Sequence, residues 1–560
     1  MEKITTESTP FAEDTGGPPP AAQQRGREEQ AVRSKCPDCG FDTYQSHRFC
    51  RRCGINLDPW QYSTTVLPNE DAAVTNDNPE CLVRDQKLTT TRLVTGRNMN
   101  IGEHRFDLVI IGSGPAGQKG AIAAAKLGKR VAIVDRRERI GGMSLHTGTI
   151  PSKTLREAVL YLTGYRQRAF YGRDYKLKAE ISVADLSERV KTVVDREMIV
   201  IREQLGRNGV TVLDGTARFT GPHTLEIEGD QGPHLVEADY VLIACGTRPA
   251  HAPDIPYGDR VRDVDQIWQV NNIPRDLIVV GAGVIGLEYA SMLTALGIRV
   301  TIIDQRPNML DFVDQEIVEA LSYHLRRREA IFRLGEKVTK VEVNERGQVQ
   351  VRLESGKRLR AEGLLYAAGR QVNTDLLNLP AAGLEPDGRG RLAVNEHYQS
   401  AVSHIYAAGD CIGFPSLAAT SMEQGRLAAH HMFGRPAADR PSLLPYGIYT
   451  IPEISMVGRT EQELTGAGIP YESGVARYDE VAKGQIIGDE TGMLKILFHP
   501  DTLKVLGVHA IGENATEIIH IGQTLLALDG TVEFLRDSVF NYPTFAEAYK
   551  VAALNGLNKL

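Results

Sequence analysis

The sequence contains few cysteines, few aromatic side chains and no long apolar run. Only 7 cysteines occur in 560 residues, and four of them lie in one short segment, which excludes a disulfide-based framework. No uninterrupted apolar stretch reaches the roughly 18 residues that a membrane-spanning helix needs. The beginning of the chain, MEKITTESTPFAEDTGGPPP, has neither the basic start nor the apolar core of a secretory signal. These absences predict a cytoplasmic protein that does not cross a membrane.

The chain also lacks a strong charge of either sign. Its formal net charge is −7, from 64 basic and 71 acidic side chains, so there is no general reason to expect nucleic-acid or membrane binding. Glycine, in contrast, is abundant, with 54 residues, which suits tight turns and phosphate-binding loops. A chain of this length exceeds what one hydrophobic core supports, so several domains are expected.

The N-terminal part of the chain differs in composition from the rest. Residues 1–35 are rich in Pro, Gly, Gln and charge, which predicts a disordered tail. Residues 36–54 carry a cluster of cysteines, and the polar residues 55–103 are expected to form a linker. From Phe106 onward, short β-branched runs alternate with Ala- and Leu-rich segments. This alternation is typical of βαβ units around a parallel sheet.

One pattern of strand, glycine loop and helix occurs twice in the chain. The strand DLVII leads into GSGPAG, and the strand LIVV leads into GAGVIG. Each copy continues into a second strand that ends in an acid, Asp135 or Asp304, 23 residues after the first glycine of its loop. Two copies with matched spacing predict two nucleotide-binding folds of the Rossmann type.

The glycines of the first loop are Gly112, Gly114 and Gly117. The first permits a tight turn, the second lets a pyrophosphate approach the backbone, and the third lets helix and strand pack closely. Asp135 would then accept hydrogen bonds from an adenosine ribose. The alternative is a structural βαβ turn without a ligand.

The second loop has the same three positions, Gly281, Gly283 and Gly286. A carboxylate at Asp304 favours the free 2′-hydroxyl of NAD(H) and repels the 2′-phosphate of NADP(H). Arg306 follows two residues later and would partly offset this repulsion if it faces the nucleotide. Alternatively, Arg306 is a solvated surface arginine.

Four further segments carry a family resemblance. Residues 141–153, GGMSLHTGTIPSK, resemble the active-site segment of the FAD-dependent pyridine nucleotide–disulfide oxidoreductases. VLIACGTRP at 241–249, HIYAAGD at 404–410 and NYPTFAE at 541–547 are similar to later segments of the same family, in the same order. The resemblance covers residues 104–560.

The resemblance implies an α/β fold with two Rossmann-like domains and an α+β C-terminal dimerisation domain. The FAD-binding domain would comprise residues 104–250 and 371–440, the NAD(P)-binding domain residues 251–370, and the dimerisation domain residues 441–560. The cysteine cluster at residues 36–54 adds a small zinc ribbon, between the predicted tail and the linker.

The chain departs from the disulfide reductases at the residues that perform thiol chemistry. Ser144 and Thr149 stand where those enzymes have two cysteines, and Tyr542 stands where they have a histidine. Reduction of glutathione, lipoamide or thioredoxin is therefore excluded. Cys245 and Cys411 are expected to be packing residues.

The segments HTGTIPSK at 146–153, YGIYTIPEI at 446–454 and FNYPT at 540–544 are similar to one branch of the family, the soluble Si-specific transhydrogenases. The implied reaction is a ping-pong hydride transfer between NADPH and NAD⁺ through FAD, without a redox-active disulfide. By this resemblance Lys153 lies near the flavin and pairs with Glu288, while Tyr542 and Glu547 complete the active site of the partner subunit in a homodimer or higher homo-oligomer. The positions implied for cofactor binding are Gly112, Gly114, Gly117, Asp135, Gly142, Lys153, Gly281, Gly283, Gly286, Asp304, Gly369 and Asp410.

Two pairs of cysteines form the N-terminal cluster, Cys36 with Cys39 and Cys50 with Cys53. This spacing brings four thiolates to one tetrahedral site, which predicts structural zinc in a ribbon-like module. The alternative is disulfide bonds. The module has too little core to fold alone, so the metal is expected to drive its folding. It is a candidate docking site for a protein partner.

Two other functions stay open at this point. Asp304 favours an NADH-specific diaphorase or quinone reductase, because a transhydrogenase must also bind NADP(H). A flavin-based redox-sensing interaction protein, which recruits a partner through the zinc ribbon, is the second alternative. All three functions use nicotinamide nucleotides, and none requires nucleic acid.

Overall fold

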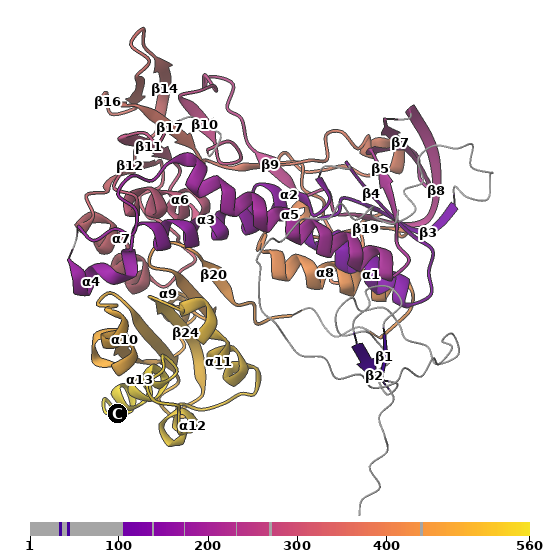
Figure 1. Ribbon diagram of the computed structural model, residues 1–560. Helices are drawn as coiled ribbons and strands as arrows, with labels where there is room; N and C mark the ends of the chain where they lie inside the picture. Colours follow the sequence, from indigo (N-terminus) through magenta and orange to yellow (C-terminus); the bar gives the residue numbers. More distant parts are fainter. Residues whose placement is uncertain are drawn as a thin grey trace, which may run out of the picture. The chain divides into compact units, whose positions relative to one another are not determined.

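The computed structural model describes residues 105–136, 139–172, 174–230, 232–267, 272–436 and 441–560 (Figure 1). It also describes the backbone of two short strands, β1 (Arg33–Lys35) and β2 (Asp42–Tyr44), which pair antiparallel. Apart from these strands, the predicted tail, cysteine cluster and linker lie outside the described residues. The same holds for Cys36, Cys39, Cys50 and Cys53.

The first large sheet contains the two strands predicted on either side of the first glycine loop and its helix, which are β3 and β4. Its order is β5-β4-β3-β8-β7-β6, with β19 added parallel to β8. Strand β19 comes from a segment far along the chain, so two separate stretches of sequence form one sheet. The strands are β3 (Arg105–Ile111), β4 (Val131–Asp135), β5 (Thr211–Asp214), β6 (Thr216–Gly221), β7 (Thr224–Gly229), β8 (Gly232–Ile243) and β19 (Ile405–Ala407).

Helices α1 (Pro115–Lys126) and α8 (Ala418–Met432) pack side by side against this sheet (Figure 1). Their close approach requires a glycine, because a Cβ atom on Gly425 would lie 2.0 Å from the Ala116 carbonyl oxygen. The helices α3 and α5 also lie side by side. The remaining helices of this region are α2 (Gly142–His146), α3 (Thr149–Leu162), η3 (Tyr165–Gln167), α4 (Arg168–Tyr171) and α5 (Val183–Arg207).

A second, parallel sheet contains the other glycine loop. Its order is β10-β17-β11-β12-β13, and helix α6 is buried from Gly286 to Ala295, its polar residues included. A three-stranded antiparallel sheet, β14-β15-β16, adjoins it, and a ribbon of β9 and β18 connects the first two domains. The elements are β9 (Thr247–Pro249), β10 (Val261–Asp263), β11 (Asp276–Val280), α6 (Val284–Ala295), β12 (Arg299–Asp304), α7 (Gln315–Arg327), β13 (Ile331–Leu334), β14 (Val338–Val343), β15 (Val349–Leu353), β16 (Arg358–Ala361), β17 (Gly363–Tyr366) and β18 (Arg370–Val372).

The C-terminal region is an antiparallel sheet in the order β20-β21-β24-β23-β22, covered by helices α11 and α13. Strand β23 is buried at every position, as expected for a central strand with both faces covered. The elements are β20 (Tyr446–Ile448), β21 (Ile454–Gly458), α9 (Glu461–Gly466), β22 (Glu472–Arg477), α10 (Ala482–Ile487), β23 (Met493–Phe498), β24 (Val505–Ile511), α11 (Ala515–Ala527), α12 (Val532–Asp537) and α13 (Glu547–Leu557). Within the described ranges, no helix is long and apolar enough to cross a bilayer.

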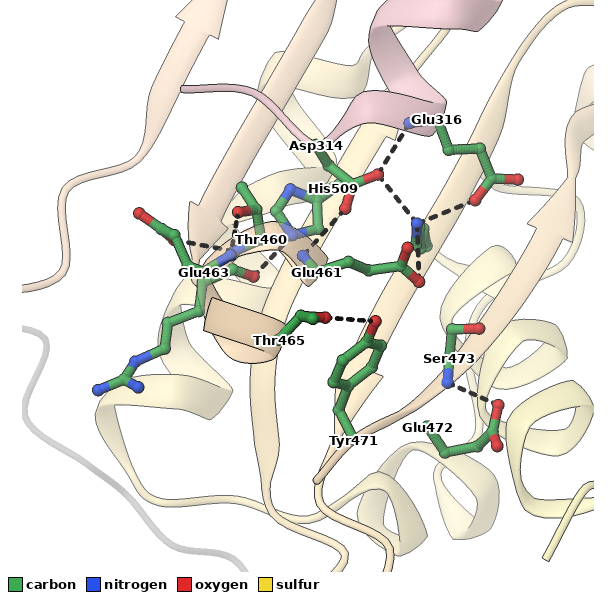
Figure 2. Close-up of polar contacts among 12 residues, drawn as sticks. Asp314, Glu316, Thr460, Glu461, Glu463, Thr465, Tyr471, Glu472, Ser473 and His509 are labelled. Carbon is green, nitrogen blue, oxygen red and sulfur yellow. Dashed lines mark hydrogen bonds and ion pairs between the residues drawn. The ribbon is translucent and has the colours of Figure 1, made fainter. Parts of the chain in front are cut away.

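A buried lysine joins the second domain to the C-terminal domain. Lys495 of β23 is 0 % exposed, and its Nζ lies 2.9 Å from Asp314 and 2.9 Å from Glu316, at the start of α7. Glu461 of α9 lies 3.2 Å from the same amine, and Figure 2 shows how the three carboxylates converge on it. Burial alone would lower the pKa of Lys495, but hydrogen bonds to Asp314 and Glu316 raise it. The amine therefore stays charged and connects the two domains.

Candidate functional site

The first glycine loop has the geometry of a phosphate cradle. Gly112 has φ = 102°, and a Cβ atom there would lie 2.4 Å from the Ala244 carbonyl oxygen. A Cβ atom on Gly117 would lie 1.9 Å from the Gly112 oxygen, so helix α1 packs directly on the loop. No atom lies within 4 Å of a Cβ built on Gly114, at the N-terminus of α1. Space and backbone N–H groups for an anionic ligand therefore coincide there.

Asp135 holds this loop in shape from the end of β4. Its Oδ2 accepts hydrogen bonds from the Ser113 backbone N–H at 2.8 Å and from the Ser113 hydroxyl at 2.6 Å. The Ser113 Oγ in turn accepts a hydrogen bond from the Gly141 N–H at 2.9 Å. Ser113 thus connects the loop to the start of the 141–153 segment. The glycine motif accepts any residue at this position, so the sequence contains no sign of this role.

A cavity of about 640 Å³ opens at this loop. Among the predicted cofactor-binding positions, it is lined by Gly112, Gly114, Asp135, Gly142 and Asp410. Gly117, Lys153 and Gly369 do not line it. Ser144 and Thr149 stand at its wall, where the disulfide reductases have cysteines.

Gly142 brings the 141–153 segment against the loop. It has φ = 63°, and a Cβ atom there would lie 2.8 Å from the Gly114 Cα. Any side chain at this position would push the segment away from the cradle. The close approach of two backbones explains why glycine occurs here.

Asp410, at the start of a 3₁₀ turn after β19, belongs to a polar chain beside the cavity. Its Oδ2 accepts a hydrogen bond from Thr247 Oγ1 at 3.1 Å, and Thr247 Oγ1 accepts one from Arg370 Nε at 2.7 Å. Arg370 Nη2 also contacts Met143 Sδ. Burial raises the pKa of Asp410, and the nearby Arg370 and Thr247 oppose this effect. Sequence reasoning missed Arg370, although it directly follows the predicted Gly369.

The second glycine loop has the same geometry as the first and follows the carboxyl end of β11, the central strand of the parallel sheet. Gly281 has φ = 110°, and a Cβ atom on Gly286 would lie 1.9 Å from the Gly281 oxygen. A Cβ atom on Gly283 would meet a single atom within 4 Å, Arg306 Nη2 at 3.9 Å. The guanidinium therefore lies beside the loop, with its side chain still 46 % exposed.

Asp304 and Arg306 form a close ion pair at this loop. Arg306 Nε lies 3.0 Å from Asp304 Oδ1, and Nη2 lies 2.8 Å from Oδ2. Asp304 Oδ2 also accepts the Ala282 N–H at 2.7 Å, as Asp135 does for the first loop. Burial would raise the pKa of Asp304, but hydrogen bonds from Arg306 and Ala282 lower it. Both side chains therefore stay charged beside the second glycine loop, at the position where the sequence predicts the ribose of the nucleotide.

Lys153 of α3 and Glu288 of α6 meet between the two domains. Lys153 Nζ lies 2.7 Å from Glu288 Oε2, and Glu288 Oε1 accepts the Tyr449 N–H at 2.9 Å. The Tyr449 ring centroid lies 4.8 Å from the amine, within the range of a cation–π contact. Glu288 is buried, so the pair is far better shielded from solvent than a surface ion pair.

Three aromatic residues from three regions converge close to this pair. The ring centroids of Phe312 and Tyr446 are 4.9 Å apart, and Phe414 lies 6.4 Å from each of them. Burial, together with the charges of Glu288 and Asp410, raises the pKa of Tyr446 to about 12. Tyr446 therefore stays protonated near both carboxylates. Tyr446 opens the motif at 446–454, but nothing in the sequence indicated a role for it.

Tyr542 and Glu547 stand apart from these residues. Tyr542 is 73 % exposed, and no hydrogen bond or ion pair among the described residues joins either side chain to Lys153 or Glu288. Glu547 Oε2 is buried without a hydrogen-bond partner in the described part of the chain. The structure of one chain therefore does not bring the C-terminal motif to the cavity.

The described cysteines are Cys245, which lines the cavity, and the buried Cys411. Both are free thiols. The neighbouring Cys411 and burial raise the pKa of Cys245 well above its usual value, so it does not supply a thiolate. In the described ranges, no group of three or more His, Cys, Asp or Glu side chains could hold a metal ion.

Comparisons with known proteins agree with this geometry. The family model described as pyridine nucleotide-disulphide oxidoreductase matches residues 106–425, and the model of that family's dimerisation domain matches residues 444–553. The chain is 56 % identical over 459 residues to a soluble pyridine nucleotide transhydrogenase of Mycobacterium tuberculosis, a match covering 81 % of this chain and 98 % of the relative. It is 45 % identical over 460 residues to one of Marinomonas sp., covering 81 % of this chain and 99 % of the relative.

Two solved structures have a similar fold. LpdA from Mycobacterium tuberculosis superposes with a TM-score of 0.74 at 27 % identity. The HOCl-induced flavoprotein disulfide reductase RclA from Escherichia coli superposes with a TM-score of 0.72 at 25 % identity. Each match covers 80 % of this chain and 99 % of the other.

Proposed function

Because the chain belongs to the pyridine nucleotide-disulphide oxidoreductase family, we propose that it is an NAD(P)⁺ transhydrogenase, which transfers a hydride from NADPH to NAD⁺ with the help of FAD. One observation carries the proposal. Ser144 and Thr149 stand at the cavity wall where a disulfide reductase has cysteines, so no thiol pair there can accept the electrons. A second nucleotide is then the acceptor that this chain is built to bind. The names of its relatives support the same reaction.

The cavity at the first glycine loop fits FAD. The open position at Gly114 and the N-terminus of α1 suit a pyrophosphate, and Asp410 offers a carboxylate to the ribityl hydroxyls. Bound FAD supplies a group that accepts a hydride from one nucleotide and returns it to another. The chain itself holds and orients the partners.

Lys153 and Glu288 are proposed to act at the reacting end of the nucleotide. Lys153 carries a positive charge, held by Glu288 and Tyr449, that would stabilise negative charge on a bound flavin. Glu288 lies in the first turns of α6, directly after the second glycine loop, where it would contact the nicotinamide ring of a bound nucleotide. The half-buried aromatic rings of Phe312 and Tyr446 would exclude water from this region.

Asp304 and Arg306 are proposed to let one site accept both substrates. The Asp304 carboxylate accepts hydrogen bonds from the 2′-hydroxyl of NAD(H), while Arg306 offers a guanidinium to the 2′-phosphate of NADP(H). Their pairing places both groups at the same loop. The ion pair supports a site that accepts NADP(H) as well as NAD(H).

A homodimer is part of the proposal. The match to a dimerisation domain supports it, and the exposed Tyr542 would then approach the partner's cavity together with Glu547. The relatives are named soluble enzymes, which supports the cytoplasmic location that the sequence predicts. We further propose that Cys36, Cys39, Cys50 and Cys53 hold structural zinc, on the basis of their spacing. Metal analysis that finds no zinc in the purified full-length chain would exclude this assignment.

The reaction is tested by mixing the purified yellow protein, without oxygen, with NADPH and thio-NAD⁺, whose reduced form absorbs at a distinct wavelength. Steady turnover is the expected result. No turnover, with the flavin bleached by NADH but not by NADPH, would instead assign an NADH-specific diaphorase. NADPH deuterated at the 4-pro-S position tests the proposed Si specificity, since the NADP⁺ that forms should have lost the deuterium, whereas a 4-pro-R label should be retained in it.

A further inference from the structure

A second cavity, of about 520 Å³, lies away from both glycine loops. It shares no lining residue with the cavity proposed for FAD. Its walls come from the segment after α3, from the C-terminal end of α7 and from the loop after α10. Five arginines line it, namely Arg156, Arg166, Arg168, Arg327 and Arg328. All three large domains therefore contribute to one cationic cavity.

The carboxylates in this cavity are already engaged or face solvent. Glu513 pairs with Arg166 at 2.6 Å. Asp489 accepts three backbone N–H groups, from Thr491, Gly492 and Glu513, at 2.7–3.1 Å. Glu329 and Glu490 are exposed. Arg156 is likewise satisfied, because it pairs with Glu157 and Glu453.

Arg168 and Arg328 have no such counter-charge. Neither forms an ion pair with a carboxylate of the described residues, and both are partly buried. Both lie close to the ring of Tyr165, with Cζ–centroid distances of 5.9 Å for Arg168 and 4.1 Å for Arg328. Burial and the charge of Arg328 lower the pKa of Arg168. Arg168 also donates hydrogen bonds to the Tyr175 and Thr163 carbonyls, but neither accepts its charge. Two partly buried cations that repel each other are stabilised by an anion that joins them.

His324 fixes Arg328 without adding a charge. Its Nε2 lies 2.7 Å from the Tyr165 hydroxyl and accepts a hydrogen bond from Arg328 Nε at 3.2 Å. Nδ1, at 3.1 Å from Thr491 Oγ1, then carries the proton. Burial and the adjacent Arg328 and Arg327 lower the pKa of His324 to about 3, so the ring is neutral at physiological pH. The Nη groups of Arg328 remain available to a ligand.

We propose that this cavity binds a phosphate dianion, free or carried by a small organic molecule, between Arg168 and Arg328. Two unpaired guanidinium groups match a dianion better than a single carboxylate, and arginine binds phosphate in a bidentate manner. The volume is in the range of small-molecule sites and exceeds that of phosphate itself. Apolar side chains of Leu160, Ile451 and Ile487 at the wall suit an organic part. Because the ligand would contact α4 and the end of α7 at once, it is an effector that stabilises their arrangement rather than a substrate.

The test uses the FAD-loaded full-length protein and inorganic phosphate, with ionic strength held constant by KCl. The expected result is a rise in Tm that saturates with phosphate concentration. Arg168→Gln and Arg328→Gln should each weaken the apparent affinity for phosphate by about 10-fold or more. Ribose 5-phosphate in a parallel titration identifies the source, since tighter binding than phosphate assigns a phosphomonoester and equal binding assigns inorganic phosphate. Both variants should retain FAD and basal turnover, because neither residue touches the nucleotide sites.

Two control variants separate this cavity from other anion sites. Arg326→Gln alters a neighbouring arginine of α7 that does not line the cavity, and it should leave the phosphate effect unchanged. Arg306→Gln removes the guanidinium at the second glycine loop and should also leave it unchanged. A phosphate effect that survives Arg168→Gln and Arg328→Gln, or that disappears with Arg306→Gln, would overturn the proposal. So would the absence of any saturable effect in the wild-type protein.

Discussion

Arg306 donates two side-chain hydrogen bonds to Asp304, so that a guanidinium and a carboxylate share the end of the second glycine loop. The two groups have opposite preferences for a nucleotide. The carboxylate favours a ribose hydroxyl, and the guanidinium favours a phosphate. Because the two charges neutralise each other, removing one of them should strengthen the nucleotide preference of the residue that remains.

We therefore expect opposite shifts from two substitutions. Arg306→Gln should raise KM for NADPH by about 10- to 100-fold, the loss of a charge-assisted hydrogen bond, with a much smaller effect on NADH. Asp304→Asn keeps an acceptor for the Ala282 N–H but frees Arg306, so it should weaken NADH and improve NADPH. Steady-state kinetics with each nucleotide as donor measures both.

The matched control is Arg299→Gln, at the start of β12, the strand that ends in Asp304. Arg299 pairs with Asp276 at 3.1 Å, away from the loop, and its side chain is 70 % exposed. This variant should change neither KM. Equal losses for NADH and NADPH in Arg306→Gln would contradict the assignment of Arg306 to the 2′-phosphate.

Lys153 offers a second prediction, on chemistry rather than affinity. Lys153→Met removes the charge that Glu288 holds at 2.7 Å, so flavin reduction by NADPH should slow on the order of 100-fold while FAD stays bound. Glu288→Gln should also slow it, because the amine loses its anchor. Stopped-flow bleaching of the flavin measures the rate. An unchanged rate in Lys153→Met would remove this residue from the mechanism.

These contacts differ in how far the sequence could predict them. Both glycine loops and their acids are local patterns, so spacing alone located them. The resemblance pairs Lys153 with Glu288, and the two side chains do form an ion pair 135 positions apart, although their chemical roles stay predictions. For Arg306 the sequence left two orientations open, because the direction of a long side chain depends on tertiary packing.

Other contacts had no signal in the sequence. The chain from Asp410 through Thr247 to Arg370 joins residues from three separate segments, and each of them reads locally as an ordinary turn or strand residue. Lys495 lies in an apolar strand, where a lysine would be expected to face solvent. Its partners come from another domain. Such contacts follow from the packing of domains, which no local pattern encodes.

The close backbone approach at Gly142 predicts a specific loss of FAD. Gly142→Ala would bring a Cβ atom to 2.8 Å from the Gly114 Cα, so the cradle should distort and the purified protein should contain little flavin. Gly128→Ala is the matched control, since Gly128 also has a positive φ, of 75°, but nothing lies within 4 Å of its Cβ position. The control should cost about 1 kcal/mol of stability and keep its flavin. The ratio of flavin to protein absorbance compares the two, and equal flavin content would contradict the crowding argument.

The Lys495 cluster predicts a stability effect with a definite pH range. Lys495→Met leaves Asp314 buried without its cation, which should lower the free energy of unfolding by about 3–5 kcal/mol. Lys504→Met is the control, because its ion pair with Asp529, at 3.5 Å, is exposed and should contribute no more than about 1 kcal/mol. Urea unfolding followed by circular dichroism measures both variants, and similar losses would show that the buried cluster adds no more than a surface pair.

The pH dependence follows from the shifted groups of the cluster. Burial would raise the pKa of Asp314, but the charge of His509 and the hydrogen bond from Lys495 lower it, so its contribution exists above about pH 4 and is lost as the pH falls through the folded value. The pKa of Lys495 is raised despite burial, so its contribution exists below about pH 10 and is lost as the pH rises through the folded value. The difference between wild type and Lys495→Met should therefore be largest between these limits and shrink in acid. A difference that stays constant down to pH values at which Asp314 is protonated would mean that lost packing, rather than the ion pair, destabilises the variant.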